Sequence, residues 1–256
     1  QFNVNLFDSD FDDAICAGEN VDFTGTGTAI TQFELFVDGV SQGTNGTGNF
    51  SLSTLPIGNP QISLSGSKLG CTYFADDTLS FTVSPIPTID MVSSDVDNVI
   101  CDGDSIIFTA SGGTTYEFLI NSISQGVNTI DTLFSDGFND GDVIDLIGYS
   151  GGCSSNSLSS FTITVDPIPP TVLSSSDVDN FICEGESITY TASGADNYEF
   201  FVGGVSQGPP SPTNVLTSNA FTGVQEIYVE GYNTGCSASS NSFTLTVNAL
   251  PDIVVT

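Results

Sequence analysis

Six cysteines carry the most evident chemistry of this chain, because two thiols can be oxidised to a disulfide. One kind of cysteine stands between Ile and x-Gly-acid and recurs at a nearly constant spacing, at Cys16, Cys101 and Cys183. The other kind follows Gly and recurs with nearly the same period, at Cys71, Cys153 and Cys236. An even number of cysteines at repeated positions predicts disulfides formed in an oxidising compartment.

Acidic residues near the first cysteine of each period are candidate ligands for calcium, a hard cation that prefers oxygen. The set comprises Asp10, Asp12, Glu19, Asp95, Asp97, Asp104, Asp177, Asp179 and Glu186. An EF-hand is excluded, because Asp13 stands where that loop needs glycine and no flanking helix is predicted. The other interpretation is that these acids form Asx turns and a solvated face, and it is slightly favoured. Apart from calcium, no cofactor is expected.

The remaining composition excludes several classes of function. Lys68 is the single basic residue against 31 acidic ones, and histidine is absent. Neutralisation of phosphates or of anionic lipid headgroups therefore has no basis, and we expect no binding of nucleic acid. No apolar run approaches the length of a membrane span, so we expect no direct membrane insertion. Without His, Arg or a Cys-x-x-Cys motif, the usual nucleophile–base pairs and zinc sites cannot form. We expect no enzymatic activity.

The elements that position these residues are predicted to be strands. Apolar and polar residues alternate in short runs rich in Thr, Val, Ile, Phe and Tyr, separated by Gly, Asn, Asp and Ser. Roughly seven strands in about 83 residues are typical of an immunoglobulin-like sandwich. We therefore predict an all-β tandem array of three immunoglobulin-like β-sandwich domains. They span residues 1–85, 86–168 and 169–250, and 251–256 opens a further repeat of a longer protein.

Proline-containing segments join the predicted domains, at 84–87, 166–170 and 248–251. Proline fixes φ and favours an extended backbone, so these joints are predicted to be semi-rigid. The array is expected to form an elongated rod.

Two disulfide connectivities are compatible with this fold. Pairing inside each repeat is favoured and would join Cys16 to Cys71, Cys101 to Cys153 and Cys183 to Cys236. In a standard immunoglobulin topology, however, the two kinds of cysteine lean toward opposite poles. A link between neighbouring domains, such as Cys101 with Cys236, therefore stays open as the minority alternative.

Three strings of the last repeat carry a resemblance to a known family: Ile182-Cys-Glu-Gly-Glu-Ser-Ile-Thr-Tyr-Thr-Ala-Ser-Gly194, Tyr198-Glu-Phe-Phe-Val-Gly-Gly-Val-Ser-Gln-Gly208 and Thr234-Gly-Cys236. They resemble the immunoglobulin-like repeats of giant SprB-type gliding-motility adhesins, which Bacteroidetes export through the type IX system. The resemblance covers essentially the whole chain and implies the stalk of an extracellular, cell-surface adhesin. It further implies three partners: the neighbouring repeats, the cell-surface motility machinery, and an external surface or glycan reached through other regions.

The resemblance also implies O-glycosylation at Asp-(Ser/Thr)-apolar sites, which here are Thr78, Ser105 and Thr132. A second function is compatible with the residues. The domains could be carbohydrate- or protein-binding modules accessory to a larger secreted protein or enzyme. Exposed aromatic side chains such as Tyr73, Phe74 or Phe138 would then provide the contacts.

Overall fold

The computed structural model describes residues 4–10 and 13–251, and every regular element among them is a β-strand. The first repeat contains β1 (Val4–Asp8), β2 (Ala14–Cys16), β3 (Val21–Gly27), β4 (Gln32–Val37), β5 (Val40–Asn45), β6 (Asn49–Leu52), β7 (Gln61–Lys68), β8 (Cys71–Phe74), β9 (Leu79–Ser80) and β10 (Thr82–Ser84). One sheet has the order β1-β3-β6 and the other β5-β4-β7-β8, with β9 also on β7. The last strand of the repeat is therefore broken into β8, β9 and β10.

The second repeat follows the same strand order. Its strands are β11 (Asp90–Ser93), β12 (Val99–Cys101), β13 (Ile106–Ser111), β14 (Thr115–Ile120), β15 (Ile123–Asn128), β16 (Thr132–Ser135), β17 (Val143–Ser150), β18 (Cys153–Asn156), β19 (Phe161–Thr162) and β20 (Thr164–Asp166). The sheets are β11-β13-β16 and β15-β14-β17-β18, and β12 pairs with β20.

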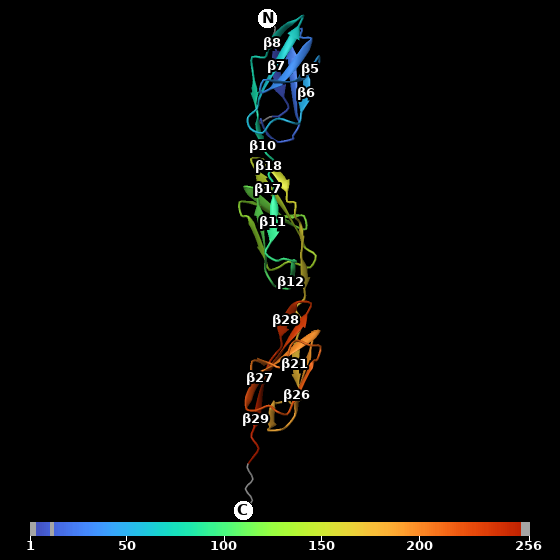
Figure 1. Cartoon of the computed structure of the whole chain (residues 1–256), viewed down its shortest axis with the longest axis vertical. Helices are drawn as coiled ribbons and strands as arrows, with labels where there is room; N and C mark the ends of the chain where they lie inside the picture. The colour runs from blue at the N-terminus through green and yellow to red at the C-terminus, as the bar shows by residue number, and fades with distance from the viewer. Residues whose placement is uncertain (1–3, 11–12, 252–256) are drawn as a thin grey trace, which may run out of the picture. The chain divides into compact units, whose positions relative to one another are not determined.

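The third repeat differs in a less divided last strand and in a shorter hairpin strand, β25. It contains β21 (Val172–Ser175), β22 (Phe181–Cys183), β23 (Ile188–Ser193), β24 (Asn197–Val202), β25 (Val205–Ser206), β26 (Val215–Ser218), β27 (Val224–Asn233), β28 (Cys236–Ser239) and β29 (Phe243–Asn248). Its sheets are β21-β23-β26 and β22-β29-β27-β24-β25 (Figure 1). The predicted fold class is confirmed: the chain is an all-β tandem array of three immunoglobulin-like β-sandwich domains.

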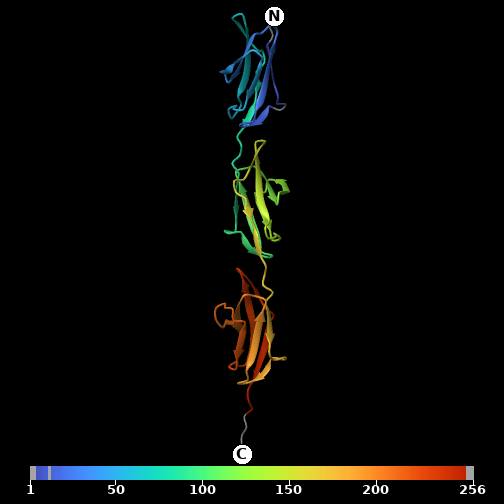
Figure 2. The same ribbon diagram turned by 90° about the vertical axis from the view of Figure 1, so that its right-hand side faces the viewer.

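Strict alternation along the strands creates the cores. In β3, Val21 and Phe23 are buried while Asp22 and Thr24 are exposed, so one side of the sheet faces inward. Phe23 packs edge-on against Phe81 with ring centroids 5.7 Å apart. Figure 2 shows the two strand layers that enclose this core in the first repeat, coloured blue to cyan.

An aromatic residue at the same place in β23 fills the core of the third repeat. Tyr190 is fully buried and lies against Phe221 and Phe243, with ring centroids 6.4 and 5.9 Å away. Its hydroxyl donates to Asn180 Oδ1 at 3.2 Å. Burial and the nearby carboxylate of Asp177 raise the pKa of Tyr190 to about 12. Large Phe and Tyr side chains thus occupy the core in a chain without tryptophan.

The backbone divides into two compact units, and the division runs through the middle repeat. One unit comprises 1–94, 108–133 and 143–161, and the other comprises 95–107, 134–142 and 162–256. The domain boundaries predicted from the sequence stay predictions. The predicted opening of a further repeat falls largely on residues 252–256, which lie outside the described residues. Among the described residues, none forms a helix that could span a membrane.

Candidate functional site

Two disulfides join successive repeats, one in each compact unit. Cys16 of the first repeat is bonded to Cys153 of the second, with Cα atoms 5.6 Å apart. Cys101 of the second repeat is bonded to Cys236 of the third, with Cα atoms 5.7 Å apart. Both separations are typical of disulfides. In both bonds, a first-kind cysteine is therefore linked to the second-kind cysteine of the following repeat.

The favoured pairing inside each repeat is wrong, and the minority alternative, Cys101 with Cys236, is correct. Cys71 and Cys183, which that pairing would have joined to Cys16 and Cys236, carry free exposed thiols in the described part of the chain. The reason is the strand register. In the first repeat Cys71 begins the broken last strand, whereas Cys16 lies opposite its last residue, Ser84. The two cysteines are thus separated along the length of the sandwich, whereas the Cα atoms of a disulfide are usually about 4.4–6.8 Å apart.

The third repeat has the same arrangement. Cys236 begins β28, and Cys183 lies opposite Asn248, the last residue of β29. The first-kind cysteine therefore marks the end of the domain where the chain leaves. The sequence signal that could have predicted this register is the Ile-Cys pair in each repeat. In the structure this pair belongs to a short strand that runs parallel to the last strand.

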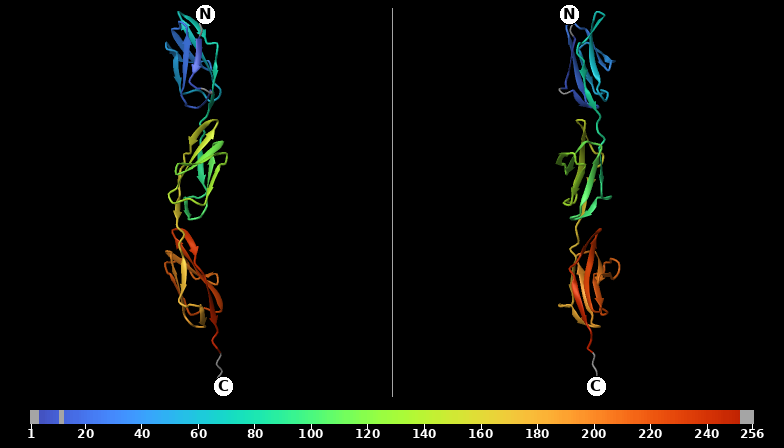
Figure 3. Two further views of the ribbon diagram at one scale, coloured as in Figure 1. Left: turned by 180° about the vertical axis from the view of Figure 1, so that it is seen from behind. Right: turned by 90° about the vertical axis from the view of Figure 1, so that its left-hand side faces the viewer.

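The linker lies against the cysteine that closes the first joint. Cys153 Sγ is 3.8 Å from the carbonyl oxygen of Ser84, and Ser155 Oγ donates to the carbonyl oxygen of Pro87 at 2.6 Å. In the second joint, Cys236 Sγ is 3.7 Å from the carbonyl oxygen of Asp166. Figure 3 shows the short extended stretch that follows β10. In both joints the sulfur contacts the last residue of the preceding domain's last strand.

Two glycines admit residues 85–89, the linker that runs from β10 to β11. A Cβ on Gly112, whose φ is +89°, would lie 1.9 Å from the carbonyl oxygen of Thr88. A Cβ on Gly148 would lie 2.2 Å from Ile89 Cδ1. In the second joint, a Cβ on Gly194 would lie 2.1 Å from the carbonyl oxygen of Pro170. The incoming chain is therefore fixed by close packing as well as by the disulfide.

The acid three residues after the first-kind cysteine closes a local turn. Glu19 Oε2 accepts from the backbone N–H of Cys16 at 3.1 Å, and Glu19 N–H donates to the Cys16 carbonyl oxygen at 3.0 Å. The same pair of hydrogen bonds joins Cys101 to Asp104 and Cys183 to Glu186. These acids position the cysteine backbone.

The upstream Asp-x-Asp motif forms Asx turns. Asp95 Oδ1 accepts from the N–H groups of Asp97 and Asn98 at 3.2 and 2.6 Å. Asp177 Oδ1 accepts from Asp179 and Asn180 at 3.2 and 2.6 Å. The turn stands where the first strand leaves one sheet and joins the last strand of the other, since β11 pairs with β13 but β12 with β20. The motif thus has a structural task in the second and third repeats.

The first copy of this acidic motif is described only in part, because Asp12 lies outside the described residues. Asp8 Oδ1 accepts from the N–H of Asp10 at 2.9 Å. Burial, followed by the nearby carboxylates of Asp13 and Asp10, raises the pKa of Asp8. Among residues 4–10 and 13–251, no group of three or more His, Cys, Asp and Glu side chains could hold a metal ion.

Calcium is expected to leave the stability of the protein unchanged, because seven of the nine candidate acids already accept backbone hydrogen bonds. The test is thermal unfolding in millimolar calcium and in chelator, at equal ionic strength. A cation that binds only the folded state raises the midpoint, because it stabilises that state by RT ln(1 + [L]/Kd). Equal midpoints are predicted. A midpoint several degrees higher in calcium would contradict this prediction and support a calcium site at these acids.

Glutamates in the central hairpins are also engaged in hydrogen bonds. Bonds from Ser124 and then Tyr149 lower the pKa of Glu117, and Tyr149 donates to Glu117 Oε2 at 2.6 Å. In the third repeat Tyr232 donates to Glu230 at 2.7 Å and is 3.1 Å from Glu199. These bonds and burial raise the pKa of Tyr232. The carboxylates serve as acceptors that tie neighbouring strands together.

The aromatic residues considered for ligand binding do not form one exposed surface. Phe138 is buried, with 6% of its area exposed, and Tyr73 packs against the core of the first repeat. Phe74 is 63% exposed, and its ring lies 5.9 Å from that of Phe36. The predicted glycosylation residues Thr78, Ser105 and Thr132 are all exposed, and their modification stays a prediction.

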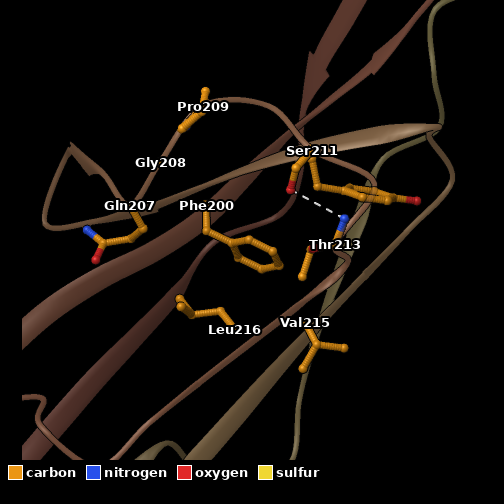
Figure 4. Close-up of a pocket in the computed structure, with 9 residues that line it drawn as sticks. Phe200, Gln207, Gly208, Pro209, Ser211, Thr213, Val215 and Leu216 are labelled. Atoms are coloured by element: carbon orange, nitrogen blue, oxygen red, sulfur yellow. Dashed lines mark hydrogen bonds between the residues drawn. The ribbon is translucent and has the colours of Figure 1, made fainter.

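A groove of about 350 Å³ occurs in the third repeat, where the loop 207–214 replaces the longer hairpin strand of the other repeats. Figure 4 shows Phe200 and Leu216 on its apolar floor, with Pro209 on the loop above. Thr213 N–H donates to Ser211 Oγ at 3.3 Å and stabilises the loop. This groove was not predicted from the sequence, although three prolines in 209–212 mark the loop as different.

Comparison with known proteins yields likenesses of structure. No family model and no curated protein matches the chain. It is similar to the I-band fragment I67–I69 from titin, at 10% identity over 93% of this chain and 95% of that chain, with a TM-score of 0.49. It is also similar to fibronectin(III)-like modules of Clostridium thermocellum CbhA, at 19% identity over 63% and 94% of the two chains, with a TM-score of 0.40. A D1–D4 ectodomain fragment of ICAM-5 shares 13% identity over 95% and 76%, with a TM-score of 0.46.

Proposed function

We propose that this chain is a load-bearing stalk segment of an extracellular adhesin, in which disulfides couple successive immunoglobulin-like domains. The observation that carries the proposal is the pairing of Cys16 with Cys153 and of Cys101 with Cys236. A cross-link inside a domain stabilises that domain, whereas a cross-link between domains limits how far they can be drawn apart. Persistent disulfides also favour an oxidising, extracellular location.

The acidic composition supports a non-enzymatic role outside the cell. A net charge of −30 favours solubility and opposes side-by-side association. The chain lacks His and Arg, and the acids closest to the cysteines serve turns. Because the two disulfides join successive repeats, we propose the neighbouring repeats as its direct partners. An external surface or glycan would be bound through other regions of the parent protein.

A role in gliding motility is the more specific part of the proposal. It rests on the resemblance of the strings around Cys183 and Cys236 to type IX-exported adhesin repeats. In that role the parent protein is moved along the cell by the cell-surface motility machinery. Tension would then pass through the segment whenever the adhesin grips a surface. Covalent joints suit that task, because the disulfides limit how far the chain extends where one of the domains unfolds.

Fab fragments raised against this chain and applied to intact, living cells test the location and the role. Labelling without permeabilisation and labels that travel along moving cells are expected. Labelling that appears only after permeabilisation would overturn the surface location. Labels that stay fixed while the cells glide would overturn the motility role. Fab fragments against an unrelated surface protein are the control for labelling that does not depend on this chain.

A second candidate function, ligand binding, is favoured only by the groove of the third repeat. Phe200, Leu216 and Val215 give it apolar walls, and Gln207, Ser211 and Thr213 supply polar groups. A glycan array probed with the whole chain and with a Phe200→Ala variant tests this function. Binding that the variant loses would support it, and an array without binding would contradict it. The variant must keep its thermal midpoint close to that of the parent chain, because Phe200 is also buried in the core.

A further inference from the structure

The disulfide register leaves one free cysteine of each kind. Each bond joins the first-kind cysteine of one repeat to the second-kind cysteine of the next. Applied to three repeats, this rule uses four cysteines and leaves Cys71 and Cys183, both exposed and both free in the described part of the chain. These two are equivalent by position to residues that are bonded elsewhere in the same molecule. The bonds of these equivalent residues therefore indicate which kind of cysteine Cys71 and Cys183 can each pair with.

The surroundings of Cys183 match those of the two bonded first-kind cysteines. Its N–H donates to Glu186 Oε2 at 3.0 Å, as Cys16 N–H does to Glu19. It lies opposite Asn248 in the parallel strand pair, as Cys16 lies opposite Ser84. The following residue, Glu184, donates its N–H to the Asn248 carbonyl oxygen at 2.9 Å, and the same bond occurs in both joints. The half-site for an incoming cysteine is therefore already built.

Cys71 likewise shares its turn with the two bonded second-kind cysteines. It begins β8 and lies opposite Lys68, as Cys153 lies opposite Ser150 and Cys236 opposite Asn233. All three turns place two residues at positive φ, and in the first repeat these are Leu69 at +50° and Gly70 at +79°. Left-handed backbone is unfavourable for leucine. The same tight turn thus presents the thiol at a position where Cys153 and Cys236 become only 2% exposed once bonded.

We propose that Cys183 and Cys71 are linkage sites for further immunoglobulin-like domains of the same kind. Cys183 takes the second-kind cysteine of a domain that follows, and Cys71 takes the first-kind cysteine of a domain that precedes. The Asn248 carbonyl oxygen would then contact the incoming sulfur, as those of Ser84 and Asp166 do in the two joints. The linkage is directional, because each end accepts only the opposite kind of cysteine.

Disulfide formation requires an oxidant, for which oxidised glutathione serves. The Cys183 thiolate attacks the glutathione disulfide and releases one glutathione thiolate, which leaves a mixed disulfide at Cys183. The thiolate of the incoming cysteine then attacks the Cys183 sulfur and releases the second glutathione. Two protein thiols are oxidised and one oxidised glutathione is reduced to two glutathione thiols, which take up, through solvent, the two protons that the protein thiols lose.

An extended chain tests the inference. A copy of residues 169–250 is fused directly after residue 250, which places its second cysteine 135 residues after Cys183, the same separation as in the Cys101–Cys236 bond. After oxidation with glutathione, alkylation and digestion without reductant, Cys183 is expected to be linked to that cysteine. Both existing disulfides are expected to be retained.

The control is the same extended chain with Ser at the second cysteine of the appended copy. There Cys183 is expected to be alkylated or capped by glutathione. Circular dichroism of both chains under reducing conditions shows that the added domain folds without the bond. A folded extended chain in which Cys183 is still alkylated, or is linked to the appended first-kind cysteine, would overturn the inference. The result does not depend on the adhesin role, because it tests the disulfide register alone.

Discussion

Stretching this chain between its two ends is expected to stop at about 300 Å while both disulfides are intact, and to continue to about 900 Å after reduction, since an extended chain spans about 3.5 Å per residue. The two disulfides turn 16–101, 101–153 and 153–236 into three parallel connections between the same two covalent nodes. The shortest connection, 101–153, limits the extension. Together with the tails 1–16 and 236–256, it leaves about 87 of the 256 residues free to extend. Single-molecule force spectroscopy with handles at the ends measures both limits.

The matched control for this prediction is Cys71→Ser, which removes a free thiol. The limit is expected to stay at about 300 Å, because Cys71 takes part in neither bond. If Cys71 were bonded to Cys16, the substitution would instead release the loop 16–71 and raise the limit by about 190 Å. Cys101→Ser is expected to raise the limit to about 410 Å, because the remaining bond encloses 137 residues. An unchanged limit in that variant would contradict the parallel connections.

Gly112→Ala is expected to destabilise the middle repeat by about 3–5 kcal/mol, among the larger effects of single substitutions. The added Cβ would lie 1.9 Å from the Thr88 carbonyl oxygen, and that atom belongs to the backbone and cannot rotate away. The positive φ of +89° adds strain for any residue with a side chain. Since 1 kcal/mol shifts the midpoint of such a domain by about 4–8 °C, calorimetry should show one transition shifted down by more than about 10 °C.

Gly103→Ala is the matched control, because φ is +85° at Gly103 but nothing lies within 4 Å of the added Cβ. It isolates the backbone strain, which is expected to cost about 1–2 kcal/mol. The difference between the two variants measures the contact between the linker and the domain that follows. Equal losses of stability would show that the linker does not pack against Gly112.

The sandwich fold could be predicted because its signals are local. Alternation in segments such as Val21–Gly27 reports which side of a strand is buried, and the threefold recurrence of cysteines and turns reports the period. The role of Asp95 and Asp177 in Asx turns also follows from short-range preference, since both accept from residues two and three positions later.

The disulfide pairing could not be predicted in the same way, because it depends on which end of a domain each cysteine occupies. Cys16 and Cys71 belong to one repeat, and their proximity in sequence favours the prediction that they pair with each other. Only the parallel pairing of β2 with β10 places Cys16 at the end where the linker leaves. The groove beside Phe200 was missed for a related reason, since it depends on how the loop 207–214 folds over the sheet.

Disulfide mapping tests the covalent coupling of successive domains most directly. The chain has one lysine and no arginine but 31 acidic residues, so a protease that cleaves at Asp and Glu is suitable. After alkylation of free thiols and digestion without reductant, Cys16 is predicted in a peptide linked to Cys153, and Cys101 in one linked to Cys236. Cys71 and Cys183 are predicted to be alkylated. Peptides that link Cys16 to Cys71 and Cys183 to Cys236 would contradict the coupling.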